Sequence, residues 1–183
     1  NTKFKSKESS TPKPNFEYSR QKYYVEKKLT EYVKKNKKKI FLSIIRLTKN
    51  LSNDTEHFRT WFKKIKRNKK IKAFNDLYFS PILFENSAKL ISEILVKKNS
   101  GIFHISNISN LNYFDFAKKL FSFLKIDTNK IIKTSSKNEK IDLIYSNKQT
   151  SLSMVCTNRK LKTKYVTLDE VFKYIKKKIN EKN

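Results

Sequence analysis

Tyr18 and Lys22 are the two residues of this sequence whose types and spacing best suit catalysis. They stand four residues apart in the segment YSRQKYYVE, which reads as the start of a basic helix. Residues four apart on a helix lie one above the other on the same face, so the phenol and the ammonium point together. An adjacent ammonium favours a phenolate, and such a tyrosine can give a proton to a carbonyl oxygen or take one from an alcohol. The pair therefore suits the proton half of a hydride transfer.

The spacing is a weak signal on its own. The chain has nine tyrosines among 183 residues and is very rich in lysine. About two Tyr-x-x-x-Lys matches are therefore expected by chance. The interpretation depends on the elements and segments that surround the pair.

Helical and strand patterns alternate along the chain, which predicts an α/β fold. Apolar residues recur at helical spacing in about 16–35, 55–67, 85–98, 112–124 and 168–179, and a short helix is expected near 158–161. Short apolar runs typical of strands lie at 40–47, 71–76, 101–106 and about 130–134. Residues 1–14 are expected to form a surface loop, and residues 76–84 a loop that contains Ser80 and Pro81. The third helix is expected to face the core with Ala88, Ile91, Ile94 and Leu95.

The composition argues against several classes of protein. A formal charge of +27 with 37% hydrophobic residues indicates a folded basic domain rather than a disordered tail. Only five of the 43 basic residues are arginines, on which nucleic-acid readers rely, so a nucleic-acid partner is not favoured. No apolar run approaches the about 18 residues of a membrane span. The single cysteine, Cys156, favours a reducing compartment, and we expect a cytoplasmic protein without a membrane partner.

Two kinds of binding site are also not expected in these residues. A Gly-rich phosphate loop cannot be built from one glycine, Gly101. Neither His57 nor His104 has a second His, Cys or carboxylate at ligand spacing, so no metal site is predicted.

The residues around the pair carry a resemblance. The segment TPKPNFEYSRQKYYVE resembles the part of extended short-chain dehydrogenases/reductases in which a Pro-x-x-x-Tyr-x-x-x-Lys-x-x-x-Glu pattern holds the catalytic tyrosine and lysine. Pro14, Tyr18, Lys22 and Glu26 fill that pattern. Five later segments are similar, in order, to the dTDP-4-dehydrorhamnose reductase (sugar-nucleotide-binding) type: FLSIIRLTKNL, IKAFNDLYFSPILFENSAKLISEIL, SGIFHISN, LNYFDFAKKL and TSLSMVCTNRKL. The resemblance spans nearly the whole chain.

The resemblance implies a fold and a domain division. The fold is the C-terminal part of a Rossmann-like extended short-chain dehydrogenase, with a small α/β substrate-binding region. Residues 1–50 are then the remainder of the nucleotide-binding domain, and residues 51–183 are mainly the substrate-binding region. The family's Gly-rich turn and catalytic Ser or Thr lie upstream of Asn1. The chain is therefore expected to be a portion of a longer enzyme, inactive by itself, whose missing N-terminal half carries the main cofactor loop.

The resemblance also implies a reaction, the reduction of a nucleotide-linked 4-keto sugar by NADPH or NADH in dTDP-rhamnose and polysaccharide biosynthesis. Tyr18 supplies the proton, and Lys22 holds the nicotinamide ribose hydroxyls, so both residues also bind the cofactor. Arg46, near the end of a predicted strand, is a candidate ligand of the substrate phosphate. Ser80 and Pro81 are substrate-binding candidates through the resemblance alone. The expected partners are a nucleotide-diphosphate sugar and the missing half, and a homodimer stays open.

The sequence departs from the family's pattern at two places. Gln21 stands where the family has Ser or Thr before the lysine, and Asn50, Leu51 and Ser52 follow the Arg46 strand where the family often carries Tyr-Gly. Two alternative functions therefore remain. One is a non-catalytic sugar-nucleotide-binding or regulatory relative, and the other is a basic nucleic-acid-binding protein.

Overall fold

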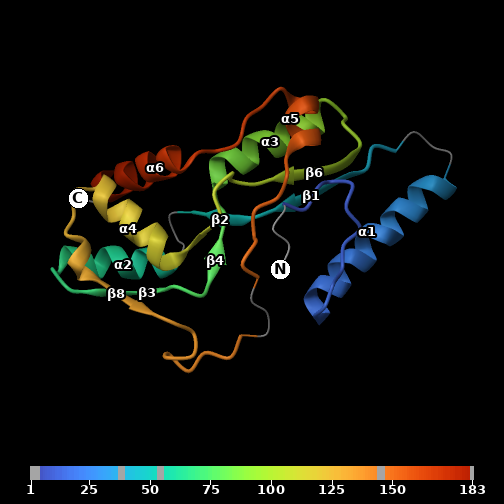
Figure 1. Cartoon of the computed structure of the whole chain (residues 1–183). Coiled ribbons are helices and arrows are strands. Elements are labelled where there is room, and N and C mark those ends of the chain that lie inside the picture. The colour runs from blue at the N-terminus through green and yellow to red at the C-terminus, as the bar shows by residue number, and fades with distance from the viewer. Residues whose placement is uncertain (1–4, 37–39, 53–55, 144–146, 182–183) are drawn as a thin grey trace.

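The computed structural model describes residues 5–36, 40–52, 56–143 and 147–181 (Figure 1). Its helices are α1 (Glu17–Lys35), α2 (Glu56–Lys66), α3 (Phe84–Val96), α4 (Tyr113–Phe123), the 3₁₀ turn η1 (Thr128–Lys130), α5 (Val155–Leu161) and α6 (Leu168–Glu181). Its strands are β1 (Ser43–Leu47), β2 (Lys49–Leu51), β3 (Ile71–Phe74), β4 (Tyr78–Phe79), β5 (Pro81–Leu83), β6 (Gly101–Ile105), β7 (Leu111–Asn112) and β8 (Ile131–Thr134).

The strands form pairs that are mainly parallel. β1 pairs with β6, β2 with β5 and β3 with β8 in parallel, whereas the short β4 and β7 pair antiparallel. Parallel partners need long crossover connections, and helices supply them here, since α2 and α3 lie between β1 and β6 in the chain. The predicted α/β class is therefore confirmed.

The larger hydrophobic core lies where α2, α4 and α6 gather around the β3–β8 pair (Figure 1). Aromatic rings fill its centre: Phe116 is fully buried, with its ring centroid 5.4 Å from that of Phe58 and 5.4 Å from that of Phe172. Trp61 meets Phe58 edge to face at 5.4 Å. These residues come from three helices, so the core holds the helices to one another.

A second core lies around β6, between α3 and α5 (Figure 1). Phe103 and Ile105 of β6 are buried against Ile94 of α3 and against Met154 and Leu161 near α5. Strand β1, in register with β6 from Ser43 opposite Gly101, rests on this core through Ile45. The second core therefore fixes the strand that carries Arg46.

One expectation about local structure was wrong, and a second was wrong in part. Residues 76–84 contain β4 and β5 and the start of α3, because Pro81, Ile82 and Leu83 pair with β2 and are buried. In α3, Ile94 is buried and Ile91 is half-buried as expected, but Ala88 and Leu95 are exposed, and the other buried residues are Ser87 and Leu90. The Ser87 hydroxyl donates to the Leu83 carbonyl at 3.0 Å, so a polar residue occupies a core position with its hydrogen bond satisfied.

Helix α1 differs from the other long helices because it buries none of its residues. Its Tyr18, Tyr24, Val25, Leu29 and Tyr32 are 45–64% exposed. Figure 1 places α1 at the end of the molecule opposite to α2, α4 and α6. An apolar helix face of this size in water is typical of a surface that binds another protein segment.

Candidate functional site

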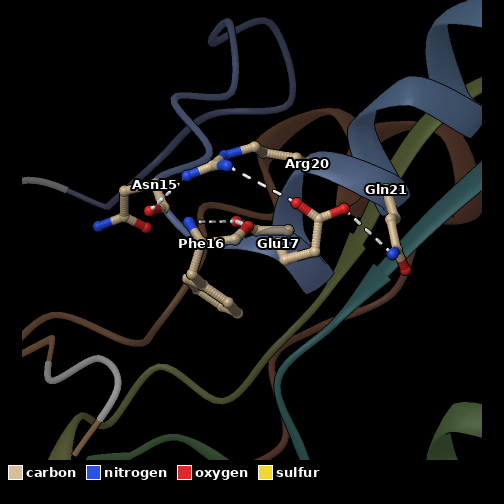
Figure 2. Close-up of polar contacts among 6 residues, drawn as sticks. Asn15, Phe16, Glu17, Arg20 and Gln21 are labelled. Carbon is tan, nitrogen blue, oxygen red and sulfur yellow. Dashed lines mark hydrogen bonds and ion pairs between the residues drawn. The ribbon is translucent and has the colours of Figure 1, made fainter.

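The first turn of α1, which carries Tyr18, is held by several local polar contacts. The Ser19 hydroxyl donates to the Phe16 carbonyl at 2.7 Å and accepts from the Phe16 N–H at 3.3 Å. Figure 2 shows Arg20 reaching back to the Asn15 carbonyl and to Glu17. Gln21, the residue that departs from the family's pattern, donates to Glu17 at 3.1 Å. The two Ser19 bonds form a capping box at the N-terminus of α1, where backbone groups lack partners within the helix.

Tyr18 and Lys22 lie together as the spacing predicts. The Lys22 ammonium is 5.4 Å from the centroid of the Tyr18 ring. Tyr18 is 64% exposed and Lys22 is also exposed, so a ligand can reach both groups from solvent. The Tyr18 ring stacks on the Phe16 ring with centroids 6.3 Å apart and planes 12° apart. The Tyr18 ring therefore has both an aromatic neighbour and a cation near it.

An ion pair ties the same helix to β1. Arg46 donates from Nε to Glu26 Oε1 at 3.0 Å and from Nη2 to Glu26 Oε2. Both side chains are only 20% exposed. The two parallel bonds make this a bidentate guanidinium–carboxylate pair, which restricts direction as well as distance. Arg46, predicted to bind a substrate phosphate, thus has an internal partner, and its role toward substrate stays a prediction.

The ion pair sets which way the Tyr18 face of α1 points. Tyr18, Lys22 and Glu26 follow one another at intervals of four and share a helix face. Because Glu26 contacts Arg46 near the carboxyl end of β1, that face turns toward this end of the strand. Helix α1 runs opposite to β1 (Figure 1), so Tyr18 lies roughly 12 Å from Glu26 along the helix axis, in the direction in which β1 runs. Ligands of α/β proteins bind at such carboxyl ends.

Ser80 and Pro81 are in a different setting. Both are buried, Ser80 completely, at the start of β5. Thr150 donates its hydroxyl to Asn110 Oδ1 at 2.7 Å, so the 3.3 Å contact from Ser80 must be a bond that Ser80 donates to Thr150. The structure therefore gives Ser80 a structural contact and does not bring it together with Tyr18 and Lys22, and a contact with substrate stays a prediction for both residues.

A buried polar cluster behind β6 was not found from the sequence. Glu8, expected in a surface loop, is 4% exposed and accepts from the Thr157 hydroxyl at 3.2 Å. Thr157 accepts in turn from the backbone N–H of His104 at 2.9 Å. The ring Nδ1 of His104 is 2.9 Å from the Ser153 carbonyl, so Nδ1 carries the proton. Glu8 and Thr157 are 149 residues apart, so no local sequence pattern predicts their contact.

Burial lowers the pKa of His104 below its ordinary value of 6.5, since the charged imidazolium loses hydration. Glu8, Arg46 and Glu26 also act on His104 through their charges. The cluster is thus close enough to the Glu26–Arg46 pair to interact with it electrostatically. Its buried position makes it part of the support for β6 and α5.

No group of three or more His, Cys, Asp or Glu side chains that could hold a metal ion is present among the residues that the structure describes. None of the described helices is long and apolar enough to cross a membrane.

Comparison with solved structures identifies the fold. A dTDP-glucose 4,6-dehydratase from Bacillus anthracis in complex with NAD matches 97% of this chain and 57% of its own, with 13% identity and a TM-score of 0.75. A dTDP-4-dehydrorhamnose reductase from the same organism in complex with NADP matches 93% of this chain and 58% of its own, with 20% identity and a TM-score of 0.73. A dTDP-4-dehydrorhamnose reductase from Yersinia enterocolitica matches 89% of this chain and 56% of its own, with 18% identity and a TM-score of 0.73.

The chain therefore spans less than three fifths of the length of these three structures and shares their Rossmann-like short-chain dehydrogenase fold. No curated protein sequence matches it. A family model described as the RmlD substrate binding domain matches residues 1–177. Since that match covers nearly all of the 183 residues, the chain belongs to the RmlD substrate binding domain family.

Proposed function

We propose that this chain is the proton-donating and substrate-binding part of an NAD(P)H-dependent reductase of a nucleotide-linked 4-keto sugar. The observation that carries the proposal is the exposed Tyr18–Lys22 pair, in which the Lys22 ammonium lies 5.4 Å from the centroid of the Tyr18 ring. The pair lies on the helix face that the Glu26–Arg46 ion pair orients toward the carboxyl end of β1. The family and the similarity to sugar-nucleotide reductases and dehydratases support the substrate class.

The residues present fit part of a nicotinamide dinucleotide. Lys22 offers an accessible ammonium for the ribose hydroxyls beside the Tyr18 phenol. The one glycine, Gly101, has φ +128° at the start of β6, so its conformational freedom is used in that turn. We therefore assign the pyrophosphate contacts to a separate dinucleotide-binding half, and we place the domain boundary between residues 50 and 51.

Helix α1 supports such a division. Its apolar face is exposed, and among the described strands β1 pairs with β6 alone, so one edge of β1 is open for a further strand. A dinucleotide-binding half that covers both surfaces would pack against α1 and pair with β1. The assignment predicts that the two halves associate through α1 and β1, and a homodimer remains a separate prediction.

The chain's own residues would act on the ketone as follows. The bound reduced nicotinamide supplies the hydride that adds to the carbonyl carbon. Tyr18 donates the phenol proton to the carbonyl oxygen, so the C=O group becomes CH–OH. The Lys22 ammonium stabilises the negative charge that remains on Tyr18. Because Tyr18 is exposed, solvent can return the proton once product leaves.

The decisive experiment compares two tyrosine variants in the protein that carries this chain together with a dinucleotide-binding half. NADPH oxidation is followed with a dTDP-linked 4-keto sugar. Tyr18→Phe is expected to lower kcat by about 10²–10⁴-fold, the usual contribution of a positioned proton donor. Tyr24→Phe, an exposed tyrosine on the same helix, is the matched control and is expected to keep full activity.

The remaining outcomes separate the alternatives. Full activity of Tyr18→Phe contradicts the proposed role of this residue. A protein that binds the sugar nucleotide but no NADPH or NADH supports a non-catalytic relative. Duplex DNA binding that weakens steeply with salt, without sugar-nucleotide binding, supports the nucleic-acid alternative.

A further inference from the structure

An apolar cavity of about 300 Å³ lies between α2 and α6, and no residue of α1 lines it. That volume is within the range of roughly 300–1,000 Å³ that small-molecule sites occupy. The cavity belongs to the larger core, through Leu51, Phe58 and Ile175, and is thus separate from the Tyr18–Lys22 pair.

The cavity changes character from floor to rim. Its floor is formed by the buried Leu51, Phe58 and Ile175, and its walls by the half-buried Phe62 and Ile179. The rim carries four cationic side chains, of which three are exposed and one is half-buried: Arg59, Lys63, Lys66 and Lys178. An apolar interior with a positively charged mouth results.

Helical spacing in both walls produces this arrangement. Phe58 and Phe62 lie four apart on α2, and Arg59 and Lys63 form the adjacent stripe one residue further. On α6, Ile175 and Ile179 are four apart, with Tyr174 and Lys178 beside them. Residues four apart share a helix face, so each helix presents an apolar stripe next to a stripe that includes cations.

The cavity offers little neutral hydrogen bonding. Its neutral polar lining groups are Ser52 and the hydroxyl of Tyr174, and Tyr174 donates that hydroxyl to Glu85 at 2.8 Å. A nucleobase or a sugar would lose its hydrogen bonds to water there without replacing them, which is costly. An alkyl chain has no such bonds to lose and gains from leaving water.

We propose that the cavity between α2 and α6 binds an amphipathic monoanion, a medium-chain alkyl carboxylate, with the chain among Leu51, Phe58 and Ile175 and the carboxylate at the cations of the rim. The charge of the rim selects an anionic head group over a cationic one. This site is separate from the residues to which the proposed reductase function assigns a role, since none of Tyr18, Lys22, Glu26 and Arg46 lines the cavity.

The single tryptophan provides the measurement. Trp61 is buried on α2, and its ring centroid is 5.4 Å from that of Phe58 in the cavity floor. Bromine quenches a nearby indole at short range, so an undecanoate tipped with bromine at the chain end is the probe. It is titrated into the whole 183-residue chain below its micellar concentration. Saturable quenching that unbrominated undecanoate reverses is expected. Binding to the exposed face of α1 would leave Trp61 unquenched.

Two controls test the head group and the rim. The bromine-tipped undecyltrimethylammonium has the same chain with the opposite charge and is expected not to quench at the same concentration. Lys63→Glu is expected to weaken undecanoate binding by about tenfold, since an attraction becomes a repulsion near the carboxylate. Lys64→Glu changes the net charge equally on the same helix but does not line the cavity, and it is expected to leave binding unchanged.

Three results would each overturn the proposal. One is the absence of saturable quenching by the brominated carboxylate. Another is equal quenching by the cationic chain, which would indicate adsorption by apolar contact alone. The third is equal weakening by Lys63→Glu and Lys64→Glu, which would indicate attraction to diffuse positive charge rather than to the rim.

Discussion

Arg46 of β1 and Glu26 of α1 form a two-point ion pair across 20 residues of sequence, with both side chains 20% exposed. Helix α1 buries no residue, so this pair is a main polar tie between the helix and the strand. The relationship makes Arg46 a residue that positions the Tyr18 face, whatever contact it makes with substrate.

Replacing Arg46 by Met is expected to loosen α1. The change leaves a partly buried Glu26 carboxylate without its charge-assisted bonds, which costs about 1–2 kcal/mol. Hydrogen exchange of the α1 amides should accelerate accordingly. Lys28→Met removes an exposed pair with Glu31, at 56% and 43% exposure, and should leave exchange unchanged. Equal protection of α1 in Arg46→Met and in the unaltered chain would show that the ion pair does not hold the helix.

The exposed apolar face of α1 is expected to make the 183-residue chain self-associate. Replacing Val25 and Leu29, which are 51% and 45% exposed, by Gln keeps a good helix former while removing apolar surface. Binding of the dye ANS and the sedimentation-average mass should both fall. Val96→Gln, at an 81% exposed position on α3, is the control and should change neither. An unchanged mass in the double variant would place the association elsewhere.

The ring cluster around Phe116 is expected to carry much of the folding stability. Phe116 is fully buried and contacts Phe58, Phe79 and Phe172. Phe116→Ala should lower the free energy of unfolding by about 3–5 kcal/mol in urea denaturation, because a large cavity replaces the ring. Phe84→Ala, at a residue 56% exposed, should change it by less than about 0.5 kcal/mol. Similar losses in the two variants would contradict the assignment of the core.

His104 is expected to make stability depend on pH. Burial lowers its pKa below 6.5, so near and below that pH the unfolded chain binds more protons than the folded chain. The contribution of the neutral His104 to the free energy of unfolding is complete above pH 6.5 and is lost as the pH falls below that value. Urea denaturation at pH 7.5 and pH 5.5 measures the difference. His104→Gln should reduce that difference whatever its effect on overall stability, and an unchanged pH dependence would assign it to other groups.

Much of the fold could be predicted because its signals are local. Helices at 17–35, 56–66, 113–123 and 168–181 follow from apolar spacing of three and four, and β1, β3, β6 and β8 follow from short apolar runs. The Tyr18–Lys22 contact follows from the same periodicity, since the side chains lie one turn apart. The apolar spacing gave a wrong prediction in α3, where Ser87 rather than Ala88 faces the core. A serine can occupy this buried position because its hydroxyl is hydrogen-bonded to the Leu83 carbonyl.

The sequence by itself therefore determined the alternation of helices and strands, the spacing of the tyrosine and lysine, and the order of segments that carries the family resemblance. Only the tertiary structure decided that Glu26 pairs with Arg46, that Glu8 is buried against Thr157, that Ser80 is enclosed, and that α2 and α6 leave a cavity with a cationic rim. The physical reason is the range of the interactions. Helix and strand periodicity is set by neighbouring residues. These contacts join residues 20 to 149 positions apart, so they form only when the chain folds and brings distant segments together.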